Sequence, residues 1–102
     1  TPLINAASEG KLDVVKYLVG MKANIESKDE GGVTSLIFAA SEGRLDVVKY
    51  LIGMKANIES KDKIGWTSLI FAASKGQLDV VAYLVGMKAN IESKNKIGWT
   101  SL

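Results

Sequence analysis

Apolar and polar residues follow one another in the same order three times along the chain, at an interval of 33 residues. In each interval a short apolar run with a double alanine is followed, after a glycine, by a longer amphipathic run. Apolar residues in the longer run recur at three- and four-residue spacing, which is the period of a helix with one buried face. The pattern predicts six helices, near residues 2–9, 12–20, 35–42, 45–53, 68–75 and 78–86.

The ends of the expected elements carry residues that suit helix and turn termini. Thr34 precedes a first helix and is a suitable N-cap, because its hydroxyl can accept a hydrogen bond from an amide of the first turn. Gly43 ends that helix. Asp62 opens a four-residue stretch with glycine in last place, which is typical of a type I turn. We expect hairpin turns at 28–33 and 61–66.

The interval divides the chain into units 1–33, 34–66 and 67–99, and residues 100–102 begin a fourth. The second and third units differ at five positions, and the first and second at seven. Two short helices and a turn cannot bury both of their faces alone, whereas stacked copies can. We therefore expect a single array over 1–102, an all-α solenoid of stacked helix pairs joined by β-hairpin turns. Because the chain opens without methionine and ends inside the pattern, we expect a longer parent array.

This pattern resembles the ankyrin repeat family in both period and residues. The matching positions of the second unit are Thr34, Leu36, Ala39, Ala40, Gly43, Leu45, Asp46, Val47 and Val48. The first unit also keeps the threonine, proline and leucine of the family's Thr-Pro-Leu-His motif, at Thr1, Pro2 and Leu3. The resemblance covers the whole chain. It implies the stacked helix-and-hairpin fold of that family and a function in binding other proteins.

The chain departs from the family at three positions of its units. The family's histidine is isoleucine throughout, so apolar burial replaces a hydrogen-bonded tie between helix and hairpin. The glycine after the second helix is lysine, for which a left-handed backbone costs about 1 kcal/mol. The family's proline is serine in the later units. These positions are Ile4, Ile37 and Ile70; Lys22, Lys55 and Lys88; and Ser35, Ser68 and Ser101. We expect them to alter local stability and not the fold.

Composition limits the chemistry available to the chain. Hydrophobic residues make up 47% and charged residues 24%, the balance of a folded globular protein. The sequence has no histidine and no cysteine, so the common nucleophile–base pairs and nitrogen or sulfur metal sites are excluded. Glu26, Glu59 and Glu92 are interpreted as solvated loop charges and not as acid–base groups. We expect a protein that is not an enzyme and has no cofactor.

The same composition bears on location. The absence of cysteine is typical of a reducing compartment. No secretory signal is present, and no apolar run approaches the roughly 20 residues that span a bilayer. We expect an intracellular, cytoplasmic protein that does not insert into membranes.

The resemblance implies that partners bind on the concave side, which hairpin tips and the ends of the first helices form. In the second and third units these positions carry lysine, isoleucine and tryptophan on the hairpin and a charged residue on the first helix. They are Lys61, Lys63, Ile64, Trp66 and Glu42 in the second unit, and Lys94, Lys96, Ile97, Trp99 and Lys75 in the third. We expect another protein to bind there.

Trp66 and Trp99 are the chain's only tryptophans, and they occupy equivalent places. Aromatic side chains at exposed tips are frequent binding hot spots. An indole can equally pack along the neighbouring hairpin and stiffen it, and the sequence leaves both interpretations open. The net charge rises from −1 in the first unit to +1 and +2 in the next two. The lysines of this mildly basic edge are interpreted first as solvated charges, and their functional alternative is the steering of an acidic segment of a partner to the edge.

Two other functions compete with partner binding. The third unit keeps the apolar set Leu78, Val81, Leu84 and Val85 with no complete unit after it, which predicts weak, concentration-dependent, head-to-tail self-association. The chain would then be a structural segment of a solenoid. Lysines interleaved with aromatic residues can also bind nucleic acid or another polyanion. The acidic first unit argues against that function, because a broad positive face is needed.

Overall fold

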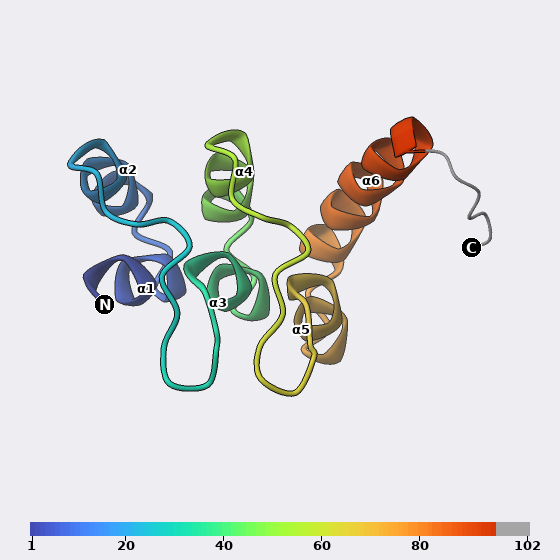
Figure 1. Cartoon of the computed structure of the whole chain (residues 1–102), viewed down its shortest axis with the longest axis horizontal. Helices are drawn as coiled ribbons and strands as arrows, with labels where there is room; N and C mark the ends of the chain where they lie inside the picture. Colours follow the sequence, from blue (N-terminus) through green and yellow to red (C-terminus); the bar gives the residue numbers. More distant parts are fainter. Residues whose placement is uncertain (96–102) are drawn as a thin grey trace.

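The computed structural model describes residues 1–95, with side chains described through residue 88. This part of the chain forms six helices that come in three pairs (Figure 1). The helices are α1 Pro2–Ser8, α2 Leu12–Gly20, α3 Ser35–Ser41, α4 Leu45–Gly53, α5 Ser68–Ser74 and α6 Leu78–Asn95. The bounds of the first five agree within one residue with those expected from the periodicity.

The pairs stack side by side in chain order. The first helices α1, α3 and α5 form one row, and the second helices α2, α4 and α6 form another (Figure 1). Two hairpin loops extend from the row of first helices. Each hairpin closes on an isolated antiparallel bridge, Lys28 with Thr34 and Lys61 with Thr67. The predicted repeat solenoid is therefore confirmed.

The first helices begin as the sequence predicts. Thr1, Thr34 and Thr67 are N-caps whose hydroxyl oxygens accept from the backbone N–H three residues later, at 3.1, 3.3 and 3.3 Å. The glycines that end these helices have positive φ, as at Gly43 with φ 74°. That backbone conformation is accessible to glycine at little steric cost, which explains the sharp turn into the second helix.

The core lies between the two rows and between successive pairs. Ala39 and Ala40 of α3 are fully buried, and their small side chains let α3 lie close to its neighbours α1 and α5. Ile37, in the place of the family's histidine, is 1% exposed. The expectation of apolar burial is confirmed at Ile37 and Ile4. It is wrong at Ile70, which is 42% exposed because no helix of the described chain covers that side of α5.

The lysines that replace the family's glycine follow the expected backbone in two of the three units. Lys22 has φ 71° and Lys55 has φ 76°, so both lie in the left-handed region. Lys88 does not, because it lies within α6. The strain expected there is absent.

The sixth helix differs from the prediction. It was expected to end near residue 86, as α2 ends at Gly20 and α4 at Gly53, but it continues to Asn95. The segment after α2 is held by hydrogen bonds from the unit that follows it. The N–H of Asn57 donates to Glu26, and the hydroxyl of Ser35 donates to the carbonyl oxygen of Ile25. Nothing in the described chain follows α6 in that way, and the segment continues the helix instead.

Candidate protein-binding edge

Each hairpin is organised by the aspartate that opens its turn. The backbone N–H of Gly32 donates to the carbonyl oxygen of Asp29 at 3.0 Å, and that of Gly65 donates to Asp62 at 3.1 Å. The carboxylate Oδ1 of Asp62 also accepts from the N–H groups of Ile64 and Trp66, at 3.0 and 2.9 Å. Asp29 does the same with Gly31 and Val33. These bonds fix both tips, and the predicted turn chemistry is confirmed.

The two tips lie next to each other. The N–H of Lys63 donates to the carbonyl oxygen of Gly31 at 3.0 Å, so the second hairpin is joined to the first through backbone atoms. Lys61 and Lys63 are exposed. Ile64, which lies between Lys63 and the turn residue Gly65, is 74% exposed. The structure therefore has three of the expected residues exposed on one hairpin, which we call the hairpin edge: Lys61 at its base, and Lys63 and Ile64 at its tip.

Trp66 lies at the base of that tip and is half-buried. Its ring meets the ring of Phe71 on α5 edge to face, with centroids 5.0 Å apart and an interplanar angle of 67°. Such a pair stabilises beyond its buried area. The packing interpretation of Trp66 thus has a specific partner, which is the following helix and not the neighbouring hairpin.

The charged positions on the first helices lie where the sequence predicts. Glu42 and Lys75 are exposed and are the C-caps of α3 and α5. Sequence reasoning missed the residues two positions later. The Nε of Arg44 donates to the carbonyl oxygen of Ser8 at 3.0 Å, and the Nε2 of Gln77 donates to that of Ser41, also at 3.0 Å. The signal in the sequence for these bonds is a long side chain with an N–H donor at the same position of every unit.

A second contact between units was also missed. The Nζ of Lys16 lies 5.7 Å from the centre of the Tyr50 ring, and that of Lys49 lies 5.6 Å from the centre of the Tyr83 ring. Each lysine therefore forms a cation–π contact with the next unit. This row runs along the second helices, on the side away from the hairpins (Figure 1). The repetition of lysine and tyrosine at adjacent positions could have indicated it.

The third hairpin expected from the sequence is not a feature of the described chain. Lys94 lies in α6 and not at a hairpin, because the helix extends past Gly86. Lys96, Ile97 and Trp99 lie outside the described residues.

The described residues contain no group of three or more acidic, histidine or cysteine side chains placed to hold a metal ion. Among the helices of residues 1–95, none is both long enough and apolar enough to cross a membrane. The three carboxylates that raised the question of acid–base chemistry are loop or helix residues. Of these, Glu26 accepts from the N–H of Asn57 at 2.7 Å, and Glu59 pairs with the Nζ of Lys88 at 3.0 Å.

Comparison with known proteins agrees with this architecture. A family model described as "Ankyrin repeats (3 copies)" matches residues 1–62, and one described as "Ankyrin repeat" matches residues 64–96. A search of curated proteins found no match.

Among solved structures, the chain is similar to one chain of the complex of the predatory endopeptidase Bd0816 from Bdellovibrio bacteriovorus with the immunity protein Bd3460. The TM-score is 0.80 and the sequence identity 40%, and the match covers 84% of this chain. It covers 45% of the other chain, so the present chain spans less than half of that relative. With its 33-residue units, capped helix pairs and bridged hairpins, the chain belongs to the ankyrin repeat family.

Proposed function

We propose that the chain is a non-catalytic binding module that docks another protein on the hairpin edge and the adjoining ends of α3 and α5. The observation that carries the proposal is the exposure of Ile64, at 74%, on a tip whose backbone is fixed by Asp62 and by Gly31 of the first hairpin. An apolar side chain held in place beside two exposed lysines offers both contact area and charge. A partner segment with acidic and apolar residues matches it.

Two further observations support this function. Ankyrin repeats mediate binding between proteins, and the similar solved structure is a complex between an immunity protein and an endopeptidase. The chain also has neither histidine nor cysteine, which leaves it without the common nucleophile–base pairs and without the nitrogen and sulfur metal ligands that those two side chains provide. A cytoplasmic location is part of the proposal and rests on the absence of cysteine.

A displayed library of random peptides, selected against the unsubstituted chain, tests the binding surface. We expect the enriched peptides to be acidic and apolar, and their affinity to fall by at least tenfold, about 1.4 kcal/mol, in Ile64→Ala. Lys61→Glu with Lys63→Glu should also weaken binding. The matched control reverses two lysines on the opposite side, Lys16→Glu with Lys49→Glu, at the same net charge. Equal losses of peptide affinity in the two double variants would reject the hairpin edge as the binding surface.

Trp66 needs a separate readout because it packs on Phe71. Loss of affinity in Trp66→Ala supports a hot-spot role only if the circular dichroism spectrum and the unfolding midpoint stay unchanged. If affinity stays the same while the midpoint falls, the indole is a packing residue alone.

A second candidate function is weak self-association through the ends of the stack. Ile70, Leu78 and Val85 are exposed at the α5–α6 end, with Leu78 78% exposed. Val14, Tyr17 and Met21 are exposed at the α1–α2 end, with Tyr17 66% exposed. In the inner stack the equivalents of most of these residues are buried in the core or packed against it, among them Ile37, Leu45, Val47, Tyr50 and Ile52. One copy can therefore continue the stack of another.

Light scattering after size exclusion tests this function. The average mass should rise with protein concentration, and Leu78→Lys should remove the rise because a charge at the end face would be desolvated on contact. A mass that stays monomeric at millimolar concentration would reject it. Steep salt dependence of binding to a polyanion such as heparin would instead support the third function considered from the sequence.

A further inference from the structure

One stretch of eight residues occurs three times with identical sequence and takes two conformations. The sequence MKANIESK occupies residues 21–28, 54–61 and 87–94. After α2 and α4 it forms two short turns within a loop that ends at the hairpin bridge. In the third unit the same sequence is part of α6. Local sequence therefore permits both states, and the surroundings decide between them.

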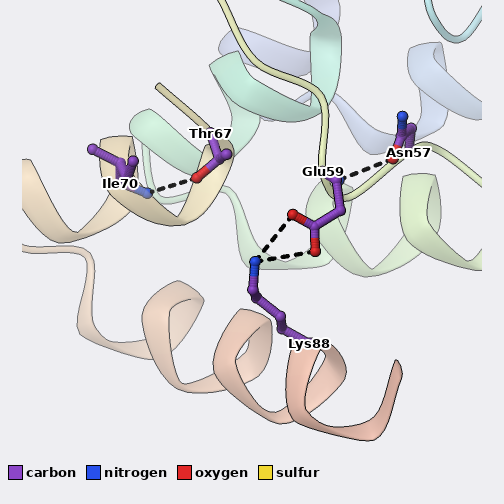
Figure 2. A network of polar contacts seen from close by, with 5 residues as sticks. All are labelled: Asn57, Glu59, Thr67, Ile70 and Lys88. Carbon is purple, nitrogen blue, oxygen red and sulfur yellow. Dashed lines mark hydrogen bonds and ion pairs between the residues drawn. The ribbon is translucent and has the colours of Figure 1, made fainter. Parts of the chain in front are cut away.

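The carboxylate of Glu59 can accept a hydrogen bond from residues 87–94 in either conformation. In the first unit, Glu26 Oε2 accepts from the backbone N–H of Asn57 in the next unit at 2.7 Å. The equivalent bond one unit later would join Glu59 and the N–H of Asn90. In the structure Glu59 instead accepts from the Nζ of Lys88, at 3.0 Å to one oxygen and 3.1 Å to the other (Figure 2). The helix thus supplies a different donor to the same acceptor.

Backbone chemistry at two positions also bears on the choice. Lys22 and Lys55 need positive φ in the loop, a conformation that side chains disfavour, and Lys88 avoids it by remaining helical. Asp29 and Asp62 each hold their turn through a charged Oδ1 that accepts two N–H groups. The third unit has Asn95 at this position, and a neutral amide oxygen is the weaker acceptor. The lysine strain acts against the loop in all three units, and the weaker turn acceptor at Asn95 is what makes the loop less favourable in the third.

The space that the loop state needs is open. A groove of about 390 Å³ lies between the 55–59 loop and α6, with Ile52 and Met87 in its walls. In Figure 1, α6 leans away from α4 towards its C-terminal end. In the preceding unit the loop that contains Glu26 runs beside the 55–59 loop, as its bond to Asn57 requires. Residues 88–92 would therefore fill the groove if they took the conformation that residues 55–59 have in the preceding unit.

We propose that residues 87–95 are a two-state element, and that the groove beside Glu59 is the docking site for residues 88–92 of the same chain in the loop form that residues 22–26 and 55–59 take. In the helical state Lys88 holds Glu59, and in the docked state the N–H of Asn90 replaces it. Docking returns Lys94 to the hairpin base, the position of Lys28 and Lys61. The proposal concerns the conformation of the isolated chain and does not depend on the proposed binding of a partner.

The test is a comparison of backbone ¹³Cα shifts and amide exchange in the full chain and in Lys88→Gly with Asn95→Asp. Glycine accepts positive φ, and aspartate restores the charged turn acceptor, so both changes favour the loop. In the unsubstituted chain we expect helical shifts through residue 94. In the double variant the helical shifts should stop near residue 87. The N–H of Asn90 is hydrogen-bonded in either state, within α6 or to Glu59, so it should stay protected from exchange although the helix around it is lost.

Lys55→Gly is the matched control, because Lys55 already has positive φ, and it should leave the shifts of 88–94 unchanged. Glu59→Ala added to the double variant should remove the protection of Asn90. Helical shifts through residue 94 in the double variant would overturn the proposal, as would loss of helix without protection of Asn90. A change that appears only as protein concentration rises would assign the groove to a second copy and would also overturn it.

Discussion

The second and third units differ at five positions in sequence and far more in environment. Ile37 is 1% exposed and its equivalent Ile70 is 42% exposed, although the residues around them in the sequence are the same. A Cβ added to Gly43 would lie 2.5 Å from Oε1 of Gln77, whereas one added to Gly76 would meet nothing within 4 Å. The comparison teaches that a residue's role in this chain is assigned by the adjacent unit. Equivalent substitutions should therefore have unequal effects.

The largest contrast is expected for the isoleucines. Ile37→Ala should lower the free energy of unfolding by about 2–5 kcal/mol, because it leaves a cavity in a fully packed region. Ile70→Ala should cost about half of that or less, since much of the side chain is already in water. Urea titration followed by circular dichroism at 222 nm measures both. Equal losses would mean that α5 is covered in solution, by a second copy or by another part of the chain.

A smaller contrast is expected for the glycines that end the first helices. Gly43 and Gly76 have φ 74° and 72°, so alanine should cost about 1–2 kcal/mol at either position through backbone strain. At Gly43 the new methyl group also displaces Gln77 from the carbonyl oxygen of Ser41, which adds about 1 kcal/mol for the lost hydrogen bond. Thermal unfolding of the two variants should therefore give a lower midpoint for Gly43→Ala. If Gly76→Ala were the less stable of the two, the contact between Gln77 and Ser41 would not contribute to stability.

The smallest contrast concerns the serines at the family's proline position. Ser68→Pro should raise stability by about 0.5–1 kcal/mol, because proline suits the first helical residue and restricts the unfolded chain. Pro2 already occupies this place in α1, and the buried hydroxyl of Ser68 has no hydrogen-bond partner within the described residues. Ser35→Pro should gain less, since the hydroxyl of Ser35 donates to Ile25 at 3.5 Å. Calorimetry on both variants would show the order, and a larger gain for Ser35→Pro would contradict it.

Most of the fold was predictable because its signals are local and repeated. The threonine caps, the terminal glycines and the aspartate turns each act within a few residues, and the structure has them where the sequence indicates. The long-range contacts of the edge were harder to predict. Trp66 could have packed on a hairpin or on a helix, and only the structure gives its partner as Phe71.

The end of α6 could not be predicted from the residues of that segment. Residues 54–61 and 87–94 are identical, so any rule based on local sequence assigns them one conformation, and the structure has two. Residues 21–28 are bonded to Ser35 and Asn57 of the unit after them, so part of what fixes that loop lies outside its own sequence. Repeat symmetry therefore gave the wrong end for α6, as it gave the wrong burial for Ile70.

The contacts of Arg44 and Gln77 bear on how arrays of this kind can be cut or recombined. Each side chain completes the last turn of the first helix in the unit before it, at the carbonyl oxygens of Ser8 and Ser41. A cut at the sequence boundary before residue 34 or residue 67 would remove that donor while keeping the acceptor. A shortened or shuffled array should therefore be cut after the donor residue, at position 44 or 77, so that the unit before it keeps this hydrogen bond. Any unit placed next in line needs a side chain long enough to reach back, as arginine and glutamine are.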